Sequence, residues 1–173
     1  MNYQREEPRL LKFLVASAAF FFIGTVHGVV QVIHPVRVWL DSIGSPYGGP
    51  GHMIDPLAHA HMNVVGGVVL LIMAATYYLF PRITNKPLYS YKLVEHTFWW
   101  TAIGISGFYS TLMFFGIYEG LMLHDDSART AQEHFHATYY PAMVSTVANV
   151  MGIGFWVFFF NVFMTYRQYK QKK

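Results

Sequence analysis

Four stretches of this chain run for more than 20 residues without an Asp, Glu, Lys or Arg, namely residues 13–33, 57–80, 97–118 and 139–166. A helix rises about 1.5 Å per residue, so each stretch is long enough to cross the roughly 30 Å hydrocarbon core of a membrane. Basic residues precede the first stretch, but its apolar core is too long for a signal peptide, and we expect it to be retained. The sequence therefore predicts one domain over residues 1–173, an all-α integral membrane protein with four transmembrane helices.

The charged residues predict how these helices are oriented. Only 12% of the residues are charged and 54% are hydrophobic, which excludes an ordinary soluble enzyme and a nucleic-acid-binding protein. Ten of the 12 Lys and Arg residues lie before the first stretch, between the second and third, or after the fourth. The positive-inside rule then predicts that both termini are cytoplasmic, in a multi-pass protein of a prokaryotic cytoplasmic (inner) membrane.

The histidines are the candidate ligands for a metal ion or a haem. The chain has no cysteine, so disulfides, thiolate metal sites and covalently attached c-type haem are excluded, and a metal or haem would need histidine or oxygen ligands. Of the nine histidines, only His96 lies on the cytoplasmic side of the predicted topology. His27, His59 and His61 lie inside predicted helices, with His27 and His61 each about 9 Å from the outer surface.

His59 and His61 are the strongest candidates for ligands. We expect Asp55 to cap the second helix and Pro56 to lie in its first turn, so that both histidines are helical. Residues two positions apart are separated by about 200° around a helix, which suits two separate sites on opposite flanks better than one metal ion. His27 has two interpretations that the sequence leaves open, a hydrogen-bonded contact between helices or a further ligand.

Other positions also carry two interpretations each. His124, His134 and His136, with Asp125, Asp126 and Glu133, form either an exterior metal site or a solvated polar loop. Glu119 is interpreted as an interfacial cap, with a proton or ion path as the alternative. Gly24 and Gly28, in a G-x-x-x-G pattern around His27, admit a neighbouring helix or a flat cofactor. The chain has no nucleophile arrangement and no phosphate loop, and no paired acid and base lies within a predicted transmembrane stretch.

Several segments resemble the last third of the catalytic subunit of haem-copper oxidases, most closely the C-type (cbb-type) oxidases and the related nitric oxide reductases. The stretch HAHMNVVGG at 59–67 is similar to the start of the tenth helix, and the segment from Leu11 to Ile33 to the ninth. The resemblance continues through YYLFPR at 77–82, LYSYKLV at 88–94, FW at 98–99 and GIYEGLM at 116–122, and ends at Asn161 and Arg167.

By this resemblance His59 would be the axial ligand of a high-spin haem and His61 one ligand of a low-spin haem. The family's remaining ligands come from earlier helices that are not in this sequence, so copper or non-haem iron would be held only together with a partner chain. His27 stands where many relatives have a carboxylate.

The leading hypothesis is a b-type haem-binding subunit, with one or two haems, that transfers electrons in a respiratory complex. It would be either a self-contained cytochrome, with His27 as a second ligand beside His61, or one half of a split oxidase or reductase. The alternatives are a non-catalytic accessory or assembly subunit, and an exterior metal-binding or sensor protein. Expected partners are lipids, other membrane subunits and a cytochrome c or quinone, with no nucleic acid. Whether this chain is itself an enzyme is left open.

Overall fold

The computed structural model describes residues 8–124 and 128–171, which are almost entirely helical. Four helical segments are long and apolar enough to span a membrane: α1 (Pro8–Val32), the run Gly49–Thr84, α6 (Tyr91–Met122) and α7 (Arg129–Lys170). The prediction of four transmembrane helices is thus confirmed by length and composition. Each helix is longer than the stretch from which it was predicted, because the charged residues at its ends are helical too.

The second segment is not one regular helix. It is built from α3 (Gly49–His52), a π-helical stretch η2 (Met53–Ala58), α4 (His59–His61), a second π-helical stretch η3 (Met62–Val69) and α5 (Leu70–Thr84). The helical backbone begins at Gly49, earlier than predicted, and is broken at Asp55, whose φ of −131° and ψ of 112° are extended. Proline at position 56 explains the break, because the residue before a proline disfavours helical dihedrals.

Asp55, which was expected to cap the start of the second helix, lies instead at the break inside this segment, and its side chain holds the connection before it. Its carboxylate accepts hydrogen bonds from Arg37 and Ser45. Arg37 also pairs with Asp41 one turn further along α2 (His34–Ser42), and these two carboxylates raise the pKa of the Arg37 guanidinium. The connection between the first two predicted helices therefore contains a short helix tied to the start of the second membrane segment.

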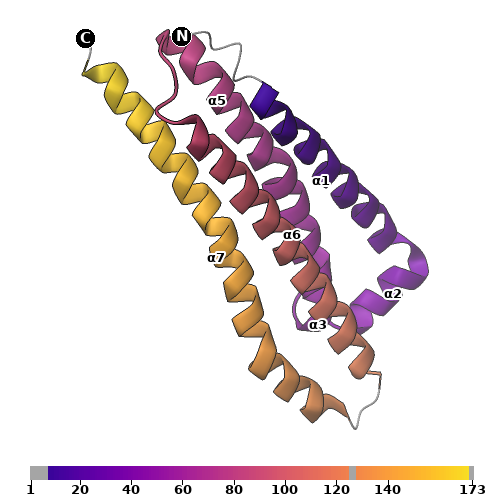
Figure 1. The fold of residues 1–173 in the computed structure, drawn as a ribbon. Helices are drawn as coiled ribbons and strands as arrows, with labels where there is room; N and C mark the ends of the chain where they lie inside the picture. The colour runs from indigo at the N-terminus through magenta and orange to yellow at the C-terminus, as the bar shows by residue number, and fades with distance from the viewer. Residues whose placement is uncertain (1–7, 125–127, 172–173) are drawn as a thin grey trace.

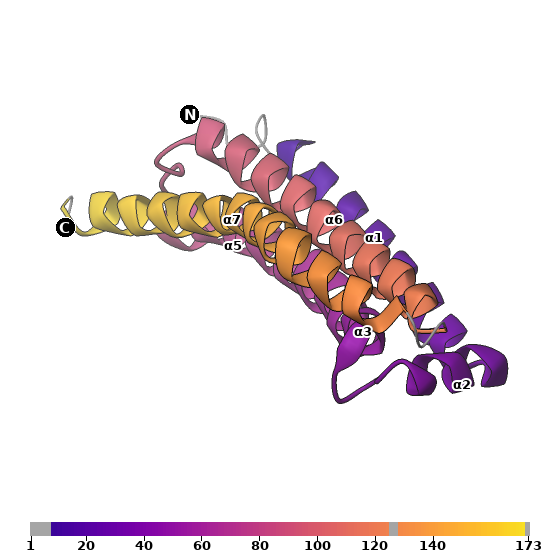
Figure 2. The same cartoon turned by 90° about the horizontal axis from the view of Figure 1, so that it is seen from below.

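The helices are arranged side by side with α7 along α6, while α1 packs on η3 and α5 (Figure 1). The start of α1 and the end of α7 lie at the same end of the molecule, which we call the terminal end (Figure 1). At the opposite end, called here the α2 end, α2 and α3 lie next to the ends of the long helices (Figure 2).

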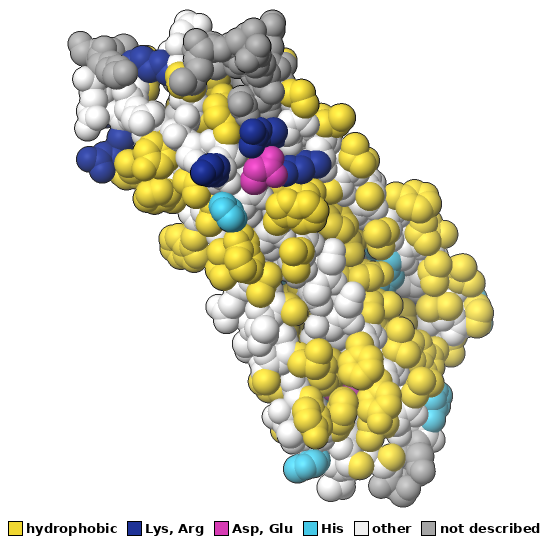
Figure 3. Space-filling model, in the orientation of Figure 1, with side chains coloured by type: hydrophobic (Ala, Val, Ile, Leu, Met, Phe, Trp, Pro, Cys, Tyr) yellow, Lys and Arg dark blue, Asp and Glu magenta, His cyan; other side chains and the backbone are white. Residues whose placement is uncertain are grey.

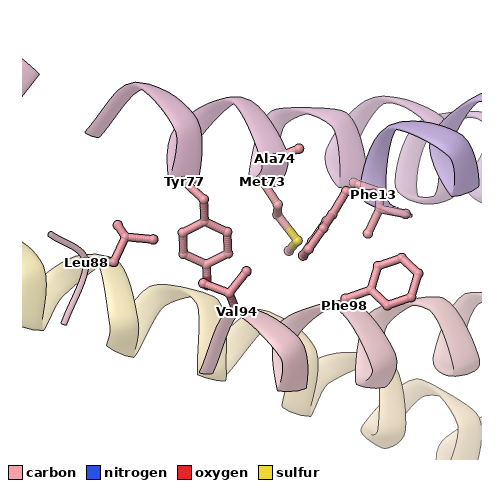
Figure 4. Close-up of a cluster of buried hydrophobic side chains, with 8 residues drawn as sticks. Phe13, Met73, Ala74, Tyr77, Leu88, Val94 and Phe98 are labelled. Carbon is pink, nitrogen blue, oxygen red and sulfur yellow. The ribbon is translucent and has the colours of Figure 1, made fainter. Parts of the chain in front are cut away.

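The larger hydrophobic core lies between α1, α5 and α6 (Figure 4). Phe13 on α1 is fully buried and meets Tyr77 and Phe98 edge to face, with ring centroids 6.3 and 5.0 Å away. Tyr77 keeps its hydroxyl satisfied by a 2.8 Å hydrogen bond to Thr97. A second core at the α2 end contains Met53, Ala58, Leu112 and Phe115.

Glycines allow close approach of α6 and α7. A methyl group on Gly104 would lie 2.4 Å from the Met151 Cα, and one on Gly154 would lie 2.2 Å from Thr101 Oγ1. On α1, a methyl group on Gly24 would meet the Asn63 side chain at 2.4 Å. Gly152, by contrast, has nothing within 4 Å of such a group among the described residues, so it makes no comparable close contact.

One buried amide fastens the far half of α7 to the loop before α6. Asn161 is fully buried, accepts a hydrogen bond from the Ser90 backbone N–H and donates one to the Ser90 carbonyl. Thr165, one turn later, accepts from the Tyr89 N–H. These bonds replace the water that would otherwise solvate the loop backbone.

Candidate functional site

His59 and His61 face different neighbours, as their expected 200° separation requires. The His59 ring packs on α1, where its Nδ1 lies 3.0 Å from Gln31 Nε2. The His61 ring packs on α6, with its centroid 4.7 Å from that of Phe108. Both histidines lie in the three-residue helix α4, so this short element supplies two separate imidazole positions.

His61 has the hydrogen bonding that a metal ligand needs. Its Nδ1–H donates to the Leu57 carbonyl at 2.8 Å, a contact supplied by the preceding helical turn. A ring nitrogen that donates in this way fixes the tautomer, so Nε2 carries the lone pair. Metal-bound histidines in proteins are commonly oriented by such a bond to a carbonyl or carboxylate. The residues around His61 therefore fit a haem iron ligand.

His59 does not offer the same freedom. A methyl group on Gly28 would lie 2.9 Å from His59 Nε2, so this nitrogen lies close to the α1 backbone. The glycine makes room for the imidazole itself and leaves no space for a flat macrocycle between His59 and α1. The small residues around His27 thus serve helix packing here, and His59 does not fit a haem in this arrangement of α1.

His27 lies beside His59 and not beside His61. A 3.2 Å hydrogen bond joins its Nδ1 to the Tyr109 hydroxyl of α6, and its ring centroid is 5.6 Å from that of His59. The contact between helices expected as one interpretation of His27 is therefore present. The fold brings His27 to His59 and Tyr109, and not to His61 as a shared haem would require.

Two polar atoms of this group lack partners among the described residues. They are His27 Nε2 and Gln31 Oε1, and both are buried. His27 also lines an apolar cavity of about 320 Å³ with Tyr109, Val26 and Met113. Buried polar groups in proteins nearly always have a partner, so the α1 side of α4 is polar and incompletely satisfied.

The histidines after α6 are separated by the fold. His124 accepts a 3.1 Å hydrogen bond from Trp39 Nε1, His134 is exposed on α7, and His136 contacts Glu119. Asp125 and Asp126 lie outside the described residues, and Glu133 is exposed. Within residues 8–124 and 128–171, no three His, Asp or Glu side chains are placed to hold one metal ion. An exterior metal site formed by His124, His134 and His136 stays a prediction.

Glu119 is not an exposed interfacial cap. Its side chain is 1% exposed, accepts a 2.6 Å hydrogen bond from Gln132 Nε2 and lies 3.0 Å from His136 Nδ1. Most of the described residues between 119 and 138 are helical, because α6 continues to Met122 and α7 starts at Arg129. Gln132 and His136 are four positions apart, which is one helical face, and that spacing was the signal available in the sequence.

Comparisons with known proteins point to one family. The sequence profile of the family described as cytochrome c and quinol oxidase polypeptide I matches residues 3–151. The cbb3-type cytochrome c oxidase subunit CcoN1 of Stutzerimonas stutzeri is 28% identical over 131 residues, which is 73% of this chain and 25% of that protein. A bacteroid cytochrome c oxidase subunit 1 homolog of Bradyrhizobium diazoefficiens is 33% identical over 120 residues, or 68% of this chain and 20% of that protein.

A third relative matches along more of the chain. The cytochrome c oxidase subunit 1 homolog of Azorhizobium caulinodans is 27% identical over 168 residues, covering 93% of this chain and 28% of that protein. The chain thus spans about a quarter of the length of these curated relatives.

Proposed function

Because the chain belongs to the cytochrome c and quinol oxidase polypeptide I family, we propose that it is a b-type haem-binding membrane subunit that transfers electrons in a respiratory complex. The observation that carries this proposal is the hydrogen bond from His61 Nδ1 to the Leu57 carbonyl, which leaves Nε2 free to bind iron. A bound haem would supply one-electron oxidation and reduction.

Within this proposal, His61 would hold one haem b, and another chain would supply the second ligand. The second ligand is assigned to another chain because His27 contacts His59 and Tyr109 instead. The Phe108 ring limits rotation of the His61 imidazole by packing against it. A haem with two imidazole ligands is saturated and passes electrons without binding a gas.

The resemblance assigns His59 a haem ligand role, but in this structure the packing of α1 occupies the space beside the His59 ring. Its Nε2 lies against Gly28, so a second haem b on His59 requires α1 to move away from α4. The two unpartnered polar atoms nearby, His27 Nε2 and Gln31 Oε1, support a polar occupant on that side. Copper or non-haem iron would be held there only with ligands from a partner chain.

The uncovered helix faces support partners in the membrane. In the most apolar 18-residue stretch of α7, only 11% is buried inside the chain, and in that of α1 only 22%. Lipids and further membrane subunits cover these faces in the proposed complex, in which this chain is one half of a split oxidase or reductase. The electron donor of the proposed complex is a cytochrome c or a quinone. Cytochrome c is the substrate in the names of the relatives, which are cytochrome c oxidase subunits.

The charge distribution supports the proposed orientation in the cytoplasmic membrane. Basic side chains gather around one acidic residue near the terminal end, above a broad apolar surface (Figure 3). Glu95 pairs there with Arg9 and Lys12. With the terminal end in the cytoplasm, the α2 end with His27, His59 and His61 lies in the outer half of the membrane.

An accessory or assembly subunit without stably bound haem is the second candidate. The observation that favours it is the closed contact between His59 and α1, which leaves one of the two expected haem positions filled by helix packing. In that role, the exposed apolar faces would bind the subunits of a larger complex.

A spectrum decides between the two candidates. The complex is purified from native membranes, and the isolated chain is purified separately in detergent. Oxidised and dithionite-reduced absorption spectra are recorded for each, with haem quantified per chain, for the wild type, for His61→Ala and for His96→Ala. His96 is exposed near the terminal end and serves as the control.

We expect a b-type spectrum that is lost in His61→Ala and kept in His96→Ala. Haem present only in the complex, yet still dependent on His61, supports the split-subunit form. Haem that is unaffected by His61→Ala, or its absence from both preparations while the subunits remain associated, refutes the haem proposal in favour of the accessory role.

A further inference from the structure

A cavity at the terminal end lies between the connection from α5 to α6 and the last turns of α7. It has a volume of about 730 Å³. Its lining comes from residues 86–89 and Tyr91 on one side and from Gln168 and Gln171 on the other. The candidate haem ligands take no part in this cavity, so it requires a separate explanation.

Hydrogen bonds between the two walls fix the shape of the cavity. The Tyr89 backbone N–H donates to Thr165 Oγ1 at 3.0 Å, and Lys86 Nζ donates to the Tyr169 carbonyl at 3.3 Å. The buried Asn161 amide holds the same connection through two further bonds. The connection is therefore tied to α7 at several points, and the cavity is a built part of the fold.

The polar groups of the cavity suit an anion. Lys86 is partly buried, and its bond to the Tyr169 carbonyl uses only one of its three ammonium protons. Gln168 and Gln171 are exposed and add amide donors. Among the described residues that line the cavity, none is Asp or Glu. A phosphate group, which has several acceptor oxygens and a negative charge, matches this set of donors.

The depth of the cavity favours a lipid as the source of the phosphate. The fourth apolar stretch ends at Tyr166, so Gln168 and Gln171 lie about 3 and 7.5 Å beyond it along the helix axis. The head-group layer on each side of a bilayer is roughly 5–7 Å thick. The cavity therefore lies at the level of the lipid head groups. The described lining offers no carboxylate to the ammonium group of a zwitterionic lipid, which favours an anionic one.

We propose that this cavity binds the head group of an anionic phospholipid, with the phosphate on Lys86 and the remaining polar atoms of the head group on Gln168 and Gln171. The Lys and Arg side chains that gather at this end add to the attraction for a negative head group (Figure 3). The bound lipid would join the connection between α5 and α6 to the end of α7. The site depends neither on haem binding nor on which side of the membrane the terminal end lies.

The test is lipid binding to the full chain, purified in detergent and freed of lipid, measured by native mass spectrometry. Phosphatidylglycerol and phosphatidylcholine with the same acyl chains are titrated separately, and glycerol 3-phosphate is added as a water-soluble competitor. The variants are Lys86→Gln and the double variant Gln168→Leu/Gln171→Leu. Lys170→Gln is the matched control, because Lys170 is exposed at the same end and its ammonium lies over the Tyr166 ring, outside the cavity.

We expect the wild type to bind phosphatidylglycerol at least about five times more tightly than phosphatidylcholine, which is the contribution of one lysine near a membrane surface. Lys86→Gln should remove this preference. The double glutamine variant should lower the affinity for phosphatidylglycerol at least about twofold, and Lys170→Gln should leave it unchanged.

Equal affinities of the wild type for the two lipids overturn the proposal. Equal losses in Lys86→Gln and Lys170→Gln overturn it too, because only the net charge of this end would then matter. Displacement of phosphatidylglycerol by an equal concentration of glycerol 3-phosphate would assign the cavity to a soluble anion instead.

The double glutamine variant keeps the test decisive if Lys86→Gln fails to fold, because both glutamines are exposed. Unchanged affinity for phosphatidylglycerol in that variant overturns the site. Haem does not enter these measurements, so their outcome is independent of the haem proposal.

Discussion

Replacing Asn161 with leucine should detach the far half of α7 from the loop before α6. Leucine has the same number and branching of side-chain heavy atoms as asparagine, so the change removes the amide without opening a cavity. It leaves the Ser90 N–H and carbonyl without the partners that they have at 3.1 and 3.0 Å. Each unsatisfied buried group costs about 1–3 kcal/mol. Because leucine recovers part of this by apolar burial, we expect Asn161→Leu to lower the free energy of unfolding by about 2–4 kcal/mol.

The matched control is Asn149→Leu on the same helix. Asn149 is exposed, and its amide donates only within α7, to the Ser145 carbonyl at 2.9 Å. No contact with another helix is lost, so we expect a change within about 0.5 kcal/mol. The assay is reversible unfolding in mixed micelles with increasing SDS, followed by the helical circular dichroism signal of both variants and the wild type.

Equal effects of the two leucine variants would refute this reasoning. They would mean that an asparagine in this helix acts through membrane solvation or helix propensity rather than through its bonds to Ser90. A small effect of Asn161→Leu alone would mean that water or another group satisfies the Ser90 backbone, and that α7 is held mainly by its packing on α6.

Two further variants test packing and charge. Gly104→Ala should lower the free energy of unfolding by about 1–3 kcal/mol in the same assay, because its methyl group would meet the Met151 backbone at 2.4 Å. Gly152→Ala, which meets nothing, should be neutral or stabilising by up to about 1 kcal/mol, and the same sign for both would contradict the packing argument. Glu95→Gln should cost less than about 1 kcal/mol, since its pair with Lys12 is partly exposed, and a cost that persists at 1 M salt would count against a surface ion pair.

The positions of His59 and His61 were predictable because helical periodicity is a local property. Two residues in one regular turn must point to opposite flanks whatever surrounds them, and the structure has His59 on α1 and His61 on α6. What each ring contacts was not predictable. The closed face of His59 depends on Gly28, which is 31 positions away in the sequence and reaches it only through the packing of α1.

The interpretation of Glu119 failed for a related reason. The segment after it reads as polar, and a polar stretch near a membrane surface is usually a solvated loop. In the structure α6 continues to Met122 and α7 starts at Arg129, so that Gln132 and His136 on α7 face the carboxylate and bury it. A hydrogen bond between two helices depends on their relative rotation, which no local pattern reports.

The sequence by itself determined the membrane class, the four spanning helices and the imidazole positions within α4, because hydropathy, helix length and periodicity are read from neighbouring residues. Only the tertiary structure decided which of those imidazoles keeps a free Nε2, which is covered by α1, and which histidine reaches the buried Glu119. The physical reason is that hydrogen-bond partners and close contacts are set by helix packing over distances that sequence periodicity does not encode.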